Sequence, residues 1–203
     1  MLLVVGGGGN GQSYFMDFLM KNNILINEFR DRDGLKHVHS LNHMNKVLQK
    51  PHNNKKVIKK IIFLYNHPYS AVMSHFRRNW QFAQMKKLGN PCQFKNRSEA
   101  TFENFSNLVL KNNKDLFGLE YQFNNWIQAE TNIPILFLDF NEINNKKEIL
   151  NTFLKKKLDY SSFIVKERNS KNNEKDPLYS IYENLYQSMK NKINNSTRKN
   201  IVK

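Results

Sequence analysis

The sequence has little cysteine and no long hydrophobic run. Its 203 residues include one cysteine, Cys92, which excludes an internal disulfide and any zinc site built from several cysteines. No apolar run approaches the about 20 residues of a membrane-spanning helix. The apolar start of the chain, Leu2 to Val5, indicates a core strand rather than the hydrophobic region of a signal peptide. We therefore expect a cytoplasmic protein without a transmembrane segment.

Acidic residues are also scarce, since 17 Asp and Glu stand against 32 Lys and Arg, for a net charge of +15. Such a charge attracts nucleic acid, anionic membranes, or sulfated and phosphorylated ligands. The lysines are scattered over 46–60, 146–157 and 190–203 with little aromatic interleaving. This distribution favours solvated helix faces and a basic, frayed tail from about residue 194, with no specific nucleic-acid partner. It leaves the oligomeric state open.

The alternation of apolar patterns predicts a single α/β domain over residues 1–203. Buried strands are expected at 2–5, 61–65 and 133–140, with a short strand at 24–26. Helices are expected at 12–21, from 41, at 68–89, 99–111, 116–130 and 146–156, and after the Asp176-Pro177 cap. Strands that alternate with helices favour a central parallel sheet covered by helices on both faces. In the last helix an apolar stripe predicts core packing; it consists of Leu178, Ile181, Tyr182, Leu185, Tyr186, Met189 and Ile193.

A glycine-rich loop, 6–11, lies between the first strand and the first helix. Glycines let the backbone turn its N–H groups toward one anion, and the helix N-terminus adds unpaired donors and a positive dipole end. The loop fits the nucleoside-triphosphate template at Gly6, Gly11 and Ser13, but Gln12 stands where that template has lysine. The loop therefore predicts an anion site without naming the anion.

The same loop also fits the dinucleotide template GxGxxG at Gly6, Gly8 and Gly11. Glu28 or Asp31 would then be the acidic residue that binds a ribose. A Rossmann-type oxidoreductase is consequently an alternative, and it leaves the later segment NHPYSAVMS unexplained.

Four segments follow expected strands or lie near their ends, and they are largely polar or glycine-rich: GGGGNGQS, KHVHS, NHPYSAVMS and the loop around Arg168. Taken together, these segments resemble the sulfotransferase family. The resemblance implies a P-loop NTPase-like three-layer α/β fold. It also implies transfer of a sulfuryl group from the co-substrate PAPS, 3′-phosphoadenosine-5′-phosphosulfate, to a hydroxyl or amine acceptor. The family's phosphosulfate loop aligns with cofactor-binding positions here, namely Gly9, Asn10, Gly11, Gln12 and Ser13, followed by Tyr14. Gly9 stands at the position of the family's lysine.

The resemblance assigns the 3′-phosphate to a second segment. The family signature RNPxDxxxS aligns with Asn66 at the arginine, Pro68 at the proline and Ser74 at the serine. Arg168 and Ser170 resemble the family's late basic loop over the same phosphate. A neutral Asn66 leaves a charge to be supplied by these residues or by a neighbouring arginine.

The third segment, LKHVHS, supplies the expected catalytic residues. Sulfuryl transfer needs a base for the acceptor proton and a cation for the departing phosphate oxygen. We expect His39 as the base and Lys36 as the electrostatic helper, with His37 as the alternative base. The implied reaction requires no metal, and His37, His39 and His43 lack a carboxylate-supported ligand pattern. The departures at Gly9 and Asn66 also keep a catalytically inactive nucleotide- or polyanion-binding relative as an alternative.

Overall fold

Runs of apolar, β-branched and aromatic residues form a parallel sheet in the computed structural model, which describes residues 1–89, 93–164 and 175–202. The described strands are β1 (Leu2–Val5), β2 (Lys60–Tyr65), β3 (Ile135–Asp139) and β4 (Ile201–Val202), in the order β1-β2-β3-β4. Each neighbouring pair is parallel, with Val4 beside Ile62 and Ile62 beside Leu136. The expected α/β class with a central parallel sheet is confirmed.

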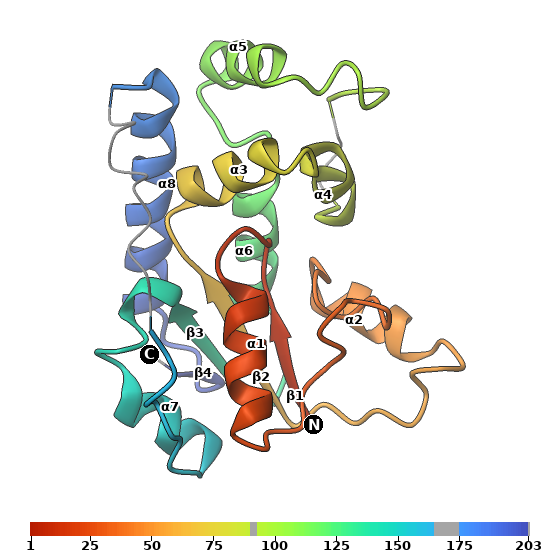
Figure 1. The fold of residues 1–203 in the computed structure, drawn as a ribbon, viewed down its shortest axis with the longest axis vertical. Helices are drawn as coiled ribbons and strands as arrows, with labels where there is room; N and C mark the ends of the chain where they lie inside the picture. Colours follow the sequence, from red (N-terminus) through yellow and green to blue (C-terminus); the bar gives the residue numbers. More distant parts are fainter. Residues whose placement is uncertain (90–92, 165–174, 203) are drawn as a thin grey trace.

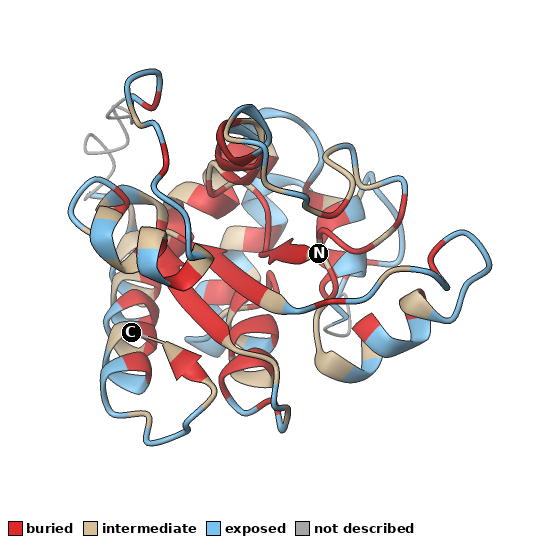
Figure 2. Cartoon of the chain, turned by 90° about the horizontal axis from the view of Figure 1, so that it is seen from below, coloured by how far each residue is buried: buried red, intermediate tan, exposed pale blue. Residues whose placement is uncertain are grey.

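Both faces of the sheet are buried, because successive side chains of each strand point to opposite sides. One face, with Val4, Ile62 and Leu136, packs against α1 (Gln12–Lys21) and α7 (Lys147–Leu154). The other face packs against the remaining helices, which include α3 (Pro68–Arg77), α6 (Leu119–Ile127) and α8 (Pro177–Asn194). Figure 1 shows α1 in front of the sheet and α6 behind it, and Figure 2 shows the strands as buried along most of their length. The molecule therefore has three layers.

Local capping sets several helix ends. Ser40 begins α2 (Leu41–Leu48), Thr101 begins α5 (Phe102–Asn112), and Asp176 caps α8 as expected. Strand β3 ends where Asp139 accepts a hydrogen bond from the Asn141 N–H and begins a short 3₁₀ helix, Phe140–Glu142. The expected apolar stripe of α8 is confirmed: Ile181 packs partly buried against the core and the other six members are buried.

The expected single helix over 68–89 is wrong. It is divided into α3 and α4 (Gln81–Lys87), because Asn79 adopts a left-handed conformation with φ of 56°. Asparagine tolerates this conformation better than most residues. The break turns the chain at Arg78 and Trp80, both of which face the cleft described below.

Two other expectations need correction. The segment 24–26 forms one parallel bridge, Leu2 to Ile26, rather than a strand. The tail expected to fray from about residue 194 instead returns to the sheet, where Ile201 pairs with Ile135 as part of β4. The apolar pair Ile201-Val202 provides the side chains for this docking, and Ile201 is buried.

Among the helices of the described ranges, none combines the length and hydropathy that crossing a bilayer requires.

Candidate functional site

A cleft of about 590 Å³ opens at the carboxyl end of β1. Its walls come from the glycine loop, the first turn of α1, the segment 29–37, and helices α3 and α4. Figure 1 shows α1 below the glycine loop and helices α3 and α4 above it. Ligands of open parallel sheets bind at this end of the strands. Of the residues expected to bind the cofactor or catalyse, the cleft is lined by Gly9, Gly11, Gln12, Ser13, Tyr14, Lys36 and Ser74.

Gly9 packs directly against helix α3. Its φ is +68°, and a Cβ added there would lie 2.5 Å from the carbonyl oxygen of Ala71. A side chain at this position would require both a left-handed backbone and a displaced helix. The lysine that the sulfotransferase family carries here is therefore incompatible with this loop conformation.

Asn10 and Gln12 brace the loop from beneath. The Asn10 side-chain amide donates to the carbonyl of Leu64 at 2.6 Å, and the Gln12 amide donates to the carbonyls of Val4 and Lys36 at 3.1 and 3.0 Å. Both side chains are buried. The Gln12 backbone N–H also donates to Asn10 Oδ1 at 3.3 Å. Asn10 and Gln12 thus hold the loop to the strand ends, and their role is to support the loop rather than to contact a ligand.

Lys36 brings an ammonium group to the start of α1. Its Nζ donates to Ser13 Oγ at 2.8 Å and to the Phe29 carbonyl at 2.9 Å. The residue is only 7% exposed, and burial lowers the pKa of the ammonium group. Lys36 and Ser13, which were predicted from separate segments, are therefore in contact. The ammonium group lies at the N-terminus of α1, where the helix dipole is also positive.

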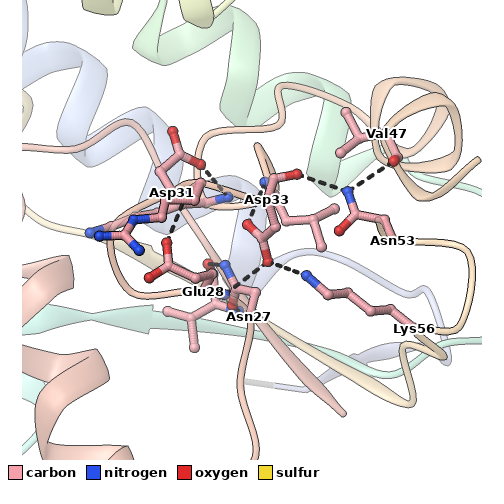
Figure 3. Close-up of polar contacts among 11 residues, drawn as sticks. Asn27, Glu28, Asp31, Asp33, Val47, Asn53 and Lys56 are labelled. Atoms are coloured by element: carbon pink, nitrogen blue, oxygen red, sulfur yellow. Dashed lines mark hydrogen bonds and ion pairs between the residues drawn. The ribbon is translucent and has the colours of Figure 1, made fainter. Parts of the chain in front are cut away.

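The wall that carries Lys36 is held by a buried carboxylate, Asp33 (Figure 3). Asp33 accepts hydrogen bonds from the backbone N–H groups of Glu28 and Leu35 at 2.8 and 3.1 Å. It also pairs with Lys56 Nζ at 2.7 Å. These contacts connect the two ends of the segment 28–35 to each other and to Lys56, and they stabilise the loop from which Lys36 projects.

Asparagine side chains attach the same wall to the rest of the fold. Asn53 is fully buried and donates to the carbonyls of Asp33 and Val47 at 2.9 and 3.0 Å, as Figure 3 shows. Asn27 accepts from the Val4 N–H at 2.8 Å and donates to the Val4 carbonyl at 3.2 Å. Asn27 thus takes the place of a strand partner beside β1, which explains why 24–26 needs no full strand there.

Positive side chains dominate the cleft. Arg30, Lys36, Arg78 and Lys87 line it together with one carboxylate, Asp31. Asp31 pairs with Lys87 Nζ at 2.7 Å and also accepts from the Lys36 N–H at 3.0 Å. The lining therefore carries four basic side chains and one acidic side chain, and a surface with this excess of positive charge attracts an anionic ligand.

His37, rather than His39, faces the cleft. His39 packs its ring against His43, with centroids 4.4 Å apart, and lies over Gly89. His37 Nδ1 lies 2.8 Å from the Gly6 carbonyl oxygen, so this nitrogen carries the proton and Nε2 keeps its lone pair. Burial lowers the pKa of His37 to about 4.

The segment expected to bind the 3′-phosphate is divided. Ser74 lines the cleft, and the guanidinium of Arg78 is tied to it through a 2.9 Å bond from Nε to the Ser74 carbonyl. Asn66 lies beneath the loop at a separate void of about 20 Å³. Arg168 and Ser170 lie outside the described residues.

Tyr14 borders the cleft but is engaged elsewhere. Its hydroxyl donates to the Ser162 carbonyl at 3.3 Å and accepts from the Ile164 N–H at 2.9 Å, while its ring stacks on Phe163. These contacts attach the chain around residue 163 to the rim of the site. Tyr14 thus holds this segment in place.

Sequence reasoning missed several lining residues, among them Arg30, His75, Trp80 and Lys87. Trp80 is 61% exposed, which is unusual for tryptophan. Its exposure depends on the helix break at Asn79, which the apolar periodicity of 68–89 concealed. His75 directly follows Ser74, so its proximity to the expected signature was the available signal.

No group of three or more His, Cys, Asp or Glu within residues 1–89, 93–164 and 175–202 is arranged to hold a metal ion. Searches against protein-family models, curated proteins and solved structures returned no match.

Proposed function

We propose that this chain is a sulfotransferase that binds PAPS in the cleft and transfers its sulfuryl group to a hydroxyl or amine acceptor. One observation carries the proposal: the glycine loop, Ser13, Ser74 and an excess of cations line one cleft. The loop and the serines come from segments that resemble separate parts of the family's nucleotide site. Their convergence is what a shared ligand would require.

The cleft suits a nucleotide with two anionic groups. Its volume of about 590 Å³ lies within the roughly 300–1,000 Å³ typical of small-molecule sites. Backbone donors of the loop and the N-terminus of α1 would hold the phosphosulfate. Ser74 and Arg78, on the opposite wall, would hold the 3′-phosphate. The three-layer α/β fold is compatible with a P-loop NTPase-like arrangement, which forms part of this proposal.

Lys36 replaces the loop lysine in this assignment. Position 9 admits no side chain, but Lys36 delivers its ammonium group to Ser13 from a neighbouring loop. Bound PAPS supplies the activated sulfuryl group. As the bond from sulfur to the phosphate oxygen breaks, Lys36 stabilises the negative charge that the leaving phosphate gains.

His37 is the proposed base. Its Nε2 has the free lone pair and takes the proton from the acceptor as the acceptor oxygen or nitrogen bonds to sulfur. A pKa of about 4 makes the free imidazole a weak base. An anion beside the ring favours the protonated form and therefore raises this pKa when the nucleotide is bound.

The two alternatives are less well supported by the geometry. For an oxidoreductase, the Glu28 carboxylate does not line the cleft and accepts a hydrogen bond from the Arg32 N–H in its own loop at 2.8 Å. Asp31 does line the cleft, but its carboxylate is engaged by Lys87 Nζ at 2.7 Å and by the Lys36 N–H at 3.0 Å. For a binding protein without activity, the favouring observation is that Asn66 lies off the cleft and Gly9 carries no cation. Transfer assays distinguish this second alternative from the sulfotransferase.

Calorimetric titration with 3′-phosphoadenosine-5′-phosphate, the product of the proposed reaction, tests the assignment. We expect micromolar binding by the wild-type chain and at least about tenfold weaker binding by Lys36→Met, because a charge-assisted hydrogen bond contributes about 1.5–3 kcal/mol. Lys46→Met, an exposed lysine on α2, is the matched control and should bind normally. Exposed Trp80 provides a fluorescence signal for the same titration, with Trp80→Phe as its control.

Absence of binding at millimolar nucleotide would contradict the proposal, and a signal on titration with NAD would favour the oxidoreductase. Transfer from radiolabelled PAPS to a panel of alcohols, sugars and amines completes the test. His37→Ala should abolish transfer while retaining nucleotide binding. Nucleotide binding without transfer to any acceptor would favour the inactive relative.

A further inference from the structure

His75 is a buried imidazole with unused hydrogen-bonding groups. It lies on α3, is 2% exposed and stacks on Phe117 with ring centroids 5.3 Å apart. Neither Nδ1 nor Nε2 makes a well-aligned hydrogen bond in the part of the chain that the structure describes, although the backbone of Gly7 and Gly8 lies close enough to oppose the lowering of the His75 pKa by burial. The residue nevertheless lines the cleft. An imidazole at the floor of an electropositive cleft thus offers a donor and an acceptor to whatever enters it.

The energetic argument distinguishes this histidine from an ordinary core residue. A neutral imidazole always has one N–H and one lone pair, and a buried donor without a partner costs stability. Native proteins contain few such groups, and each calls for an explanation. A phenylalanine would fill the same space against Phe117 without this cost. A ligand that accepts the hydrogen bond supplies the explanation.

The position of the ring identifies the part of the ligand that it can reach. A Cβ added at Gly8 would lie 3.0 Å from His75 Nε2 and 3.2 Å from His37 Cε1. The two imidazoles therefore flank Gly8, in the middle of the loop that forms the anion cradle. His75 is consequently placed to reach an anionic group that the loop holds.

We propose that His75 is a ligand-binding residue whose ring N–H donates a hydrogen bond to an oxygen of the sulfate or phosphate group held by the glycine loop. The identity of that ligand as PAPS depends on the proposed function, whereas the anion contact itself does not. Burial lowers the pKa of His75 to about 4, so the free ring is neutral near pH 7. The contact therefore adds a directional donor to the cradle without adding charge, in contrast to Lys36.

Two substitutions separate ligand binding from a packing role. His75→Phe keeps a planar ring against Phe117 and removes both nitrogens, and His75→Asn keeps a donor in a smaller side chain. We expect His75→Phe to retain or raise the melting temperature and to bind the anion at least about tenfold more weakly. His75→Asn should recover part of the affinity. His43→Phe, a histidine of α2 off the cleft, is the matched control and should bind normally.

Titrations use two probes, 3′-phosphoadenosine-5′-phosphate and inorganic pyrophosphate, with calorimetry and with NMR of nitrogen-labelled histidine side chains. We expect the His75 ring signals of the wild-type chain to shift on titration with either probe. The NMR measurement tests the contact in the wild-type protein even where a variant fails to fold.

The outcomes separate the two proposals. Nucleotide binding that leaves the His75 signals and the His75→Phe affinity unchanged overturns the inference and leaves the proposed function standing. Pyrophosphate binding that requires His75, without nucleotide binding, supports the contact and contradicts the sulfotransferase assignment. Failure of both probes to bind overturns both.

Discussion

Substitution of Gly9 by alanine tests the close approach between the glycine loop and α3. Alanine introduces a Cβ at φ of +68°, 2.5 Å from the Ala71 carbonyl oxygen. The left-handed conformation costs a residue with a side chain about 1 kcal/mol. The close contact is with backbone, which cannot rotate away, and relieving it adds about 2 kcal/mol by analogy with overpacked cores. We therefore expect a loss of about 3 kcal/mol in the free energy of unfolding.

Gly34 provides the matched control. Its φ is +70°, nearly the same as that of Gly9, but an added Cβ would meet only Val47 Cγ1, at an ordinary 3.7 Å. Gly34→Ala should therefore show the conformational cost alone, about 1 kcal/mol. The difference between the two variants measures the contact with α3.

Thermal unfolding followed by circular dichroism is a suitable assay. For a chain of this size, 1 kcal/mol lowers the melting temperature by about 2–4 °C. Gly34→Ala should thus melt about 2–4 °C below the wild type, and Gly9→Ala roughly 6–12 °C below. Equal changes in the two variants would refute the packing argument and with it our explanation of why lysine is excluded from position 9. Gly9→Lys should be at least as unstable as Gly9→Ala.

Two further predictions concern stability. The pKa of His75 is lowered from 6.5 to about 4 on folding, so its contribution to stability is complete above about pH 6.5 and is lost as pH falls toward 4, by up to about 3 kcal/mol. Urea titrations between pH 7 and 4 should show a smaller decline for His75→Phe, and an identical decline in both proteins would contradict the assignment. Asp33→Ala removes two backbone hydrogen bonds and the partner of Lys56, and should cost about 3 kcal/mol. Asp17→Ala, which breaks an exposed pair with Lys21, should cost under about 1 kcal/mol in the same urea assay, and similar losses in the two variants would count against a structural role for Asp33.

The sequence by itself determined the elements whose signals are local. The apolar strands at 2–5, 61–65 and 133–140 lie at or within a few residues of their expected limits, and the helix at 12–21 has its predicted bounds. Asp176 and the stripe of the last helix were equally predictable, because capping and helical periodicity depend on neighbouring residues. The association of the glycine loop with Lys36 and Ser74 was expected from the resemblance alone.

Only the tertiary structure decided which side chains of these segments face the cleft. His37 and His39 are two residues apart, yet one faces the cleft and the other packs on His43. The helix break at Asn79 depends on a single left-handed residue, and β4 depends on pairing between residues 66 positions apart in the chain, Ile135 and Ile201. These outcomes rest on contacts between distant segments, whose energies a local pattern does not contain. The sequence could not single out His75 for the same reason, because the hydrogen bonding of its ring nitrogens depends on residues from distant segments.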